Sequence, residues 1–184
     1  MPVIESINKK YPRAYAFPRD VKNLLRYIAK PDATAYPPFS CQHLIGAVPD
    51  IVSADQPGAW KRAARLFCHQ LELYPKQGCL MQHRVISFSS EESQDPVLAF
   101  CLAKEVAAFY YERGYLSFFG VHQDTNNIHI HIAVSNISWK DGSYFFICSE
   151  LALLYSGFNT WYQNYMCGKN LPLFHSILIE HLEG

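Results

Sequence analysis

The chain has 184 residues, of which 49% are hydrophobic and 17% charged, as is ordinary for one globular domain with its own core. Sixteen basic residues balance sixteen acidic ones, which excludes the overall positive charge that many DNA-binding domains carry. No apolar run approaches the ~20 residues of a membrane span, the first residues lack a secretory signal, and six scattered cysteines indicate free thiols in a reducing cytoplasm. We therefore expect one cytoplasmic domain over residues 1–184.

Four elements are predicted in the first part of the chain. Residues 2–8 alternate between polar and apolar side chains as a strand. Residues 17–30 form a helix, because apolar side chains recur at i, i+3, i+4 and i+7 between a proline in the first turn and Pro31. Residues 42–48 form a short strand or an extended edge segment, and residues 57–73 form a second helix with its apolar side chains inward.

The second part of the chain is richer in strands. Residues 79–88 alternate as a strand, and residues 96–113 form a long helix that a glycine ends. A hairpin follows, and after an Asp-Gly turn a short strand is expected at residues 144–147. A last helix covers residues 150–167, while the apolar residues 173–182 fit either a strand or a helix. This order of elements predicts an α+β fold with an at least partly antiparallel sheet.

The hairpin over residues 116–134 carries three histidines on one face. Its second strand alternates isoleucines with His129 and His131, so the isoleucines face a core and the histidines face ligand or solvent. If the polar turn lies at residues 124–127, His122 stands roughly opposite His129, with about 4.5–5.5 Å between the Cβ atoms. Three imidazoles at such distances can share one metal ion, which favours a metal site over three structural histidines.

Three segments of the chain resemble the MobA-type plasmid relaxases, the mobilization nucleases of the HUH endonuclease superfamily. The sequence His-x-Asp-Thr and the following His-x-His, within residues 122–131, are similar to the family's three-histidine motif. Residues 83–91 resemble its His-x-x-x-Ser-Phe-x-x-Glu segment, and residues 24–28 resemble the N-terminal helix that carries a nucleophilic tyrosine. The segments follow one another in the family's order, and the resemblance covers roughly residues 3–170.

The resemblance implies a fold, an activity and partners. The fold would be a central, about five-stranded antiparallel sheet with the metal site on its middle strands and helices over the other side. The activity would be a strand-specific nickase in which Tyr27 attacks single-stranded DNA at a transfer origin and forms a 5′-phosphotyrosyl intermediate, for conjugative mobilization of a plasmid. Accessory mobilization proteins and a secretion coupling protein are the protein partners that the resemblance implies.

The same resemblance implies a divalent metal ion as cofactor. Its ligands would be His122, His129 and His131, which leave coordination positions open for the scissile phosphate. Magnesium or manganese is the ion expected from the family, while zinc or nickel also suits three imidazole ligands.

The roles of several other residues stay open. Asp124 would orient a ligating histidine or act as a base for Tyr27, or it is a turn residue that bonds its own backbone. Glu91 matches the family's acidic position and is either catalytic or a charge at a helix N-terminus. His83 matches the same segment and is expected to be a buried structural histidine. The alternatives to Tyr27 as nucleophile are Tyr11, Tyr15 and Tyr36.

Basic residues gather near Tyr27 although the total charge is zero. The first thirty residues contain seven basic and two acidic side chains, a local excess of five positive charges. We expect Lys22, Arg26 and Lys30 to contact DNA phosphates, although a solvated helix face explains the same pattern.

The chain departs from the family pattern at two points. The asparagine expected after the last histidine is Ser135 here, with Asn136 one position later. We also expect the C-terminal regions usual in the family to be absent. Two other functions therefore stay open. One is a metal-dependent nuclease whose nucleophile is water, and the other is a non-catalytic module that binds single-stranded DNA.

Overall fold

Nine regular elements lie in the part of the chain that the computed structural model describes, namely residues 3–7, 15–29, 45–48, 59–89, 92, 95–123, 127–145 and 149–166. In chain order they are β1 (Val3–Ser6), α2 (Pro18–Ala29), β2 (Ile45–Val48), α3 (Ala59–Leu73), β3 (Met81–Ser87), α4 (Pro96–Glu112), β4 (Ser117–His122), β5 (His129–Ser135) and α5 (Glu150–Met166). The strand expected at residues 144–147 is seen only as an isolated bridge between Ile137 and Tyr144. Residues 146–148 and 173–182 lie outside the described residues.

The strands form one five-stranded antiparallel sheet in the order β1-β3-β5-β4-β2. The middle strand is β5, which pairs with β4 on one edge and with β3 on the other. His122 on β4 stands directly opposite His129 on β5, as the hairpin pattern predicts. The expected α+β fold with a central antiparallel sheet is therefore confirmed.

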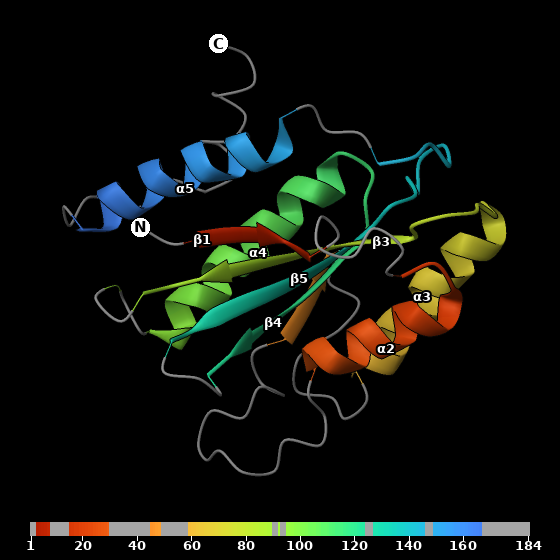
Figure 1. The fold of residues 1–184 in the computed structure, drawn as a ribbon, viewed down its shortest axis with the longest axis horizontal. Coiled ribbons are helices and arrows are strands. Elements are labelled where there is room, and N and C mark those ends of the chain that lie inside the picture. Colours follow the sequence, from red (N-terminus) through yellow and green to blue (C-terminus); the bar gives the residue numbers. More distant parts are fainter. Residues whose placement is uncertain are drawn as a thin grey trace.

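Helices cover both faces of this sheet (Figure 1). On one face α4 and α5 pack on the apolar side of β5, including Ile130 and Ile132. On the opposite face α2 and α3 pack together and against Phe118 and Ala133, which share that face with the histidines.

The expectation that the histidines face ligand or solvent holds in part. The apolar stripe of α2 packs on the sheet beyond the histidines and covers part of this face, so His122 and His131 are buried. His129 is partly exposed, and His131 lines a cavity.

The local sequence explains how α2 forms. Pro18 occupies the first turn, and the Asp20 carboxylate accepts a hydrogen bond from the backbone N–H of Phe17 (2.9 Å), which satisfies a donor at the helix N-terminus. The buried stripe consists of Val21, Leu24, Leu25, Ile28 and Ala29. With that stripe turned inward, Lys22, Arg26 and Tyr27 lie on the exposed side of the helix.

A buried ion pair ties β3 to α5 on the other face. Arg84 donates two hydrogen bonds to the Glu150 carboxylate, 2.9 Å from Nε to Oε1 and 2.7 Å from Nη2 to Oε2. Tyr110 on α4 donates to the same carboxylate, and Arg84 also donates to Ser6 Oγ on β1 (2.8 Å). The two charged side chains are only 5% and 7% exposed. Each therefore needs the opposite charge of its partner to compensate for the water that it loses on burial.

The composition predicts that no segment spans a membrane and that the cysteines are free thiols. Within the described ranges no helix has both the length and the apolar character needed to cross a bilayer. Cys68, Cys79 and Cys101 are free thiols.

We expect Glu150→Ala to lower the free energy of unfolding by about 3–5 kcal/mol, because it leaves a buried guanidinium without its carboxylate. Urea denaturation measures the change. Glu72→Ala is the matched control, since Glu72 belongs to an exposed ion pair with His69 and should change stability by less than about 0.5 kcal/mol. Equal effects of the two substitutions would contradict the prediction, because they would show that the buried Arg84 guanidinium tolerates the loss of its carboxylate.

Candidate metal centre and active site

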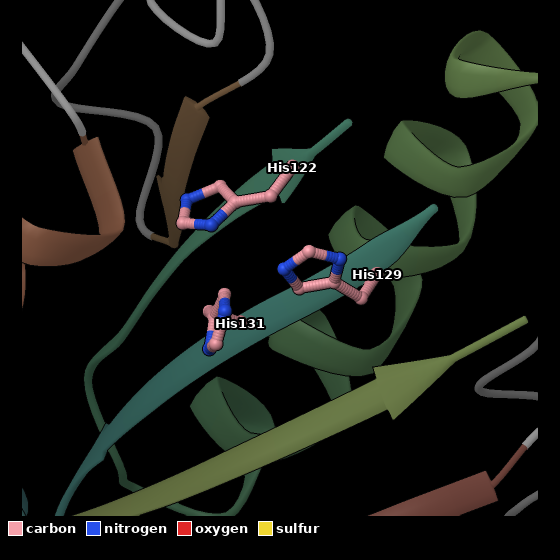
Figure 2. Close-up of side chains that lie close together, drawn as sticks. All are labelled: His122, His129 and His131. Atoms are coloured by element: carbon pink, nitrogen blue, oxygen red, sulfur yellow. The ribbon is translucent and has the colours of Figure 1, made fainter. Parts of the chain in front are cut away.

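Three imidazoles converge on one face of the β4–β5 hairpin. Figure 2 shows His122, His129 and His131 on the same side of the two strands, with their rings turned toward one another. The ring centroids lie 4.5–5.4 Å apart, and one ligand nitrogen from each ring lies within 4.8 Å of the others. His122 and His131 are buried and His129 is partly exposed. The predicted set of three histidines is thus one cluster in space.

Backbone carbonyls define which nitrogen carries the proton in two of these rings. His122 Nε2 lies 2.8 Å from the carbonyl oxygen of Ile28, and His129 Nδ1 lies 3.2 Å from that of Asn127. A carbonyl oxygen only accepts, so each of these nitrogens donates. In the neutral rings the lone pairs are then on His122 Nδ1 and His129 Nε2, and these are the atoms that can bind a metal.

The third ring belongs to a chain of side chains. His131 Nδ1 lies 2.9 Å from His83 Nε2, and His83 Nδ1 lies 2.8 Å from the Tyr15 hydroxyl. Because His131 is bonded through Nδ1, its Nε2 is the atom that can join the other two rings in binding a metal. Three imidazole nitrogens form a donor set that suits a divalent transition ion and leaves coordination positions for oxygen ligands. The residues present therefore fit the metal that the sequence pattern implies.

Tyr27 lies beside this cluster. Its ring centroid is 5.2 Å from that of His131, 5.9 Å from that of His122 and 6.4 Å from that of His83. The side chain is 50% exposed, so one side of the ring meets the histidines and the other meets solvent. Tyr27 and His131 also line a cavity of about 500 Å³ together with Tyr15, Asp20 and Asn23. The fold thus brings together two segments that are about 100 residues apart in the sequence.

The last turn of α2 sits directly on β4. The Ile28 carbonyl is among the last four of the helix, which have no partner inside the helix, and it accepts the hydrogen bond of His122 instead. Gly120 allows this approach, because a Cβ atom there would lie 2.6 Å from the Ile28 oxygen. One backbone group therefore links the neighbour of Tyr27 to a candidate metal ligand.

The other predicted site residues are only partly described. Lys22 and Arg26 lie exposed on the same helix as Tyr27. Lys30, Asp124 and Glu91 lie outside the described residues, as do the alternative nucleophiles Tyr11 and Tyr36. Asn136 bonds the Cys79 carbonyl (2.7 Å) and Gln82 Nε2 (2.8 Å), so it ties the end of β5 to the start of β3.

Burial keeps two members of the site uncharged. Burial lowers the pKa of His83 to about 4, and the nearby positive charge of Arg84 adds to the effect. Burial also raises the pKa of the Tyr15 phenol to about 12, with contributions from Tyr27 and Cys79. At neutral pH the hydrogen bond between Tyr15 and His83 therefore joins two neutral groups.

The sequence missed the role of His83. As expected it is buried, but both of its ring nitrogens bond to side chains of the site and one of those side chains is His131. Strand alternation places His83 on a definite face of β3. The missing information was that β3 pairs with β5, where His83 is opposite Ala133 and diagonal to His131.

We expect Gly120→Ala to lower the free energy of unfolding by about 1–3 kcal/mol, because the added methyl group meets a backbone atom that cannot turn away. Metal affinity should fall as well, since the Ile28 carbonyl that is pushed away also orients His122. Urea denaturation and calorimetric metal titration measure the two effects. The control is Gly78→Ala, where a Cβ has open space but the backbone φ is +99°. It should cost about 1–2 kcal/mol of stability and leave metal affinity unchanged.

The stability of the metal-free protein should rise with pH between about 4 and 6.5. His83 has its pKa near 4 in the folded chain and 6.5 in the unfolded one, so unfolding takes up a proton within this window. The contribution of neutral His83 to the free energy of unfolding is fully present above pH 6.5. It falls as the pH is lowered, and at pH 4 it has decreased by roughly 3 kcal/mol. Urea denaturation of the wild type and of His83→Gln in a chelator tests this. Identical pH profiles would contradict it, because the other histidines titrate in both proteins.

A family model described as the MobA/VirD2-like nuclease domain of relaxases matches residues 51–149, more than half of the chain. The matched segment contains β3, β4, β5 and the three histidines, whereas Tyr27 lies before it. No curated protein and no solved structure matches the chain. The match implies that the chain is a DNA endonuclease. The chain belongs to the MobA/VirD2-like relaxase family.

Proposed function

We propose that the chain nicks single-stranded DNA at a transfer origin by attack of Tyr27 on the scissile phosphate. The observation that carries this proposal is the contact of Tyr27 with the histidine cluster, at 5.2 Å from the His131 ring and 5.9 Å from the His122 ring. The half-exposed ring supports it, because DNA can approach from the solvent side while the histidines lie on the other side. The reaction would take place in the cytoplasm and serve the conjugative mobilization of a plasmid.

In this proposal His122, His129 and His131 hold one divalent cation, magnesium or manganese by the family resemblance. When bound, the ion supplies positive charge next to the phosphate oxygens. The chain fixes the tautomers of the three imidazoles, through the carbonyls of Ile28 and Asn127 and through His83. This preorganisation spares the site the cost of arranging its ligands during the reaction.

The reaction itself is an exchange of ester bonds. The Tyr27 oxygen forms a bond to phosphorus, and the bond between phosphorus and the 3′-oxygen of the preceding nucleotide breaks. The phenol loses its proton and the leaving 3′-oxygen gains one, so no oxidant or further reactant is needed. The product is a 5′-phosphotyrosyl link, and the free 3′-hydroxyl of the cut strand can reverse the step.

The proton of Tyr27 needs an acceptor, since a protonated phenol is a weak nucleophile. Asp124 and Glu91 are the carboxylates that we propose for this step. In the sequence, Asp124 follows His122 by two residues and Glu91 follows the end of β3 by four.

The DNA path would run along the exposed side of α2. Lys22 and Arg26 lie exposed on this helix, and Lys30 follows it in the sequence. Positive side chains next to Tyr27 would hold the phosphates on either side of the scissile one. Accessory mobilization proteins and a coupling protein remain part of the proposal, as partners that deliver the origin and take up the covalent complex.

Adduct formation tests the nucleophile. The protein is incubated with single-stranded DNA that carries the candidate transfer origin and with manganese or magnesium, and the products are separated on a denaturing gel. We expect a shifted protein–DNA band from the wild type, its complete loss in Tyr27→Phe, and its loss in excess chelator. Tyr144→Phe is the matched control, because Tyr144 is exposed to a similar degree, 45%, and contacts Lys76 and Gln77 instead of the histidines.

The other outcomes separate the competing functions. A shifted band from Tyr27→Phe would move the nucleophile to another tyrosine. Cut DNA without attached protein would favour a nuclease that uses water. Binding of the DNA without cleavage, at every metal concentration, would favour a non-catalytic module.

A further inference from the structure

We propose that His83 and Tyr15 are positioning residues that hold His131 in its metal-binding tautomer and thereby raise the metal affinity of the site. This inference rests on the proposed function in one respect, namely that His131 is a metal ligand. It does not depend on which group attacks the DNA.

The contacts form a continuous chain from the cluster to the cavity. His131 Nδ1 and His83 Nε2 are 2.9 Å apart, and the two rings have their centroids 5.2 Å apart. His83 Nδ1 and the Tyr15 hydroxyl are 2.8 Å apart, with the rings in an edge-on arrangement. Each ring nitrogen of His83 is thus within hydrogen-bond distance of a side chain of the site.

The chain has two proton arrangements, and only one of them suits a metal. In the first, His131 Nδ1–H donates to His83 Nε2, and His83 Nδ1–H donates to the Tyr15 oxygen, so that His131 Nε2 keeps its lone pair. In the second, Tyr15 donates to His83, His83 donates to His131 Nδ1, and the proton of neutral His131 lies on Nε2. Metal binding selects the first arrangement. An acceptor on the second nitrogen of a ligating histidine also increases the basicity of that ligand.

The surroundings hold both positioning residues in place. His83 is 4% exposed, and its backbone is part of β3, opposite Ala133 on β5. The Tyr15 carbonyl accepts a hydrogen bond from the backbone N–H of Leu80 (2.8 Å), just before β3. Tyr15 also has a positive φ of 60°, an unusual backbone conformation for a bulky residue. Such a backbone conformation persists only where the surroundings fix the residue. The hydroxyl itself is placed by its hydrogen bond with His83 Nδ1.

Metal affinity is the measurement that tests this role. Manganese is titrated calorimetrically into the metal-free protein without DNA, and the unfolding midpoint of each metal-free variant is measured as well. We expect His83→Leu to weaken manganese binding by about 10–100-fold. His83→Gln should stay within about fivefold of the wild type, because its amide oxygen can accept from His131. Tyr15→Phe keeps the ring and should give a smaller loss than His83→Leu.

The control is His69→Leu, which removes an imidazole from the exposed side of α3 and should leave the affinity unchanged. A His83→Leu variant with wild-type affinity would overturn the proposal. So would a His83→Gln variant that loses as much affinity as His83→Leu, because a packing role does not distinguish an acceptor from an apolar group. If His83→Leu does not fold, the affinity of Tyr15→Phe decides: an unchanged value overturns the proposal, and a weakened one supports it.

The same titration separates this inference from the proposed nucleophile. Failure of the adduct test together with a weakened His83→Leu variant would leave the positioning role standing. A wild type that binds no manganese at all would overturn the positioning role and the metal-dependent function together.

Discussion

The approach of α2 to β4 is the constraint on which the site depends. A helix end carries carbonyls that the helix itself cannot satisfy, and here the Ile28 carbonyl finds its donor in His122. Gly120 permits the contact, since any side chain would meet the Ile28 oxygen. The residue before Ile28 is Tyr27, so the hydrogen bond that orients His122 also fixes the helix turn that carries the proposed nucleophile. The apolar stripe of α2 then secures the helix against α3 and the sheet.

The packing of α2 on the sheet partly buries the histidine face, and this burial affects the protonation of imidazoles on that face. Taken out of water, an imidazole loses part of its tendency to bind a second proton, as the lowered pKa of His83 shows. A neutral ring is the form that binds a metal. The carbonyls of Ile28 and Asn127 then determine which nitrogen is presented. A more open face would leave the rings free to rotate, so the partial burial of the cluster favours its use as a metal centre.

Local patterns in the sequence predict the histidine hairpin and α2, whereas contacts that depend on the order of the strands cannot be predicted from them. The hairpin with His122 opposite His129 could be predicted, because alternation and a polar turn are local signals. The same holds for α2, whose observed bounds differ from the expected ones by one residue at each end. The pairing of β3 with β5 is long-range, and without it the sequence indicates only a buried structural role for His83. The role of the Ile28 carbonyl could not be seen either, since a backbone group leaves no trace in a side-chain motif.

Two tyrosines meet at the same cavity, and their surroundings suit them to different roles. The Tyr15 hydroxyl is bonded to His83, and burial raises its pKa to about 12, so it is kept protonated and held in place. Tyr27 is half exposed, with the histidines on one side and solvent on the other. A nucleophile that must reach a bound DNA strand needs a partly exposed side chain such as that of Tyr27. A residue that orients a metal ligand needs a buried and hydrogen-bonded side chain such as that of Tyr15. Tyr27 lies outside the segment that matches the relaxase family, residues 51–149. Its contact with the matched histidines therefore comes from the packing of α2 on the sheet, which adds support for the proposed reaction beyond the family match.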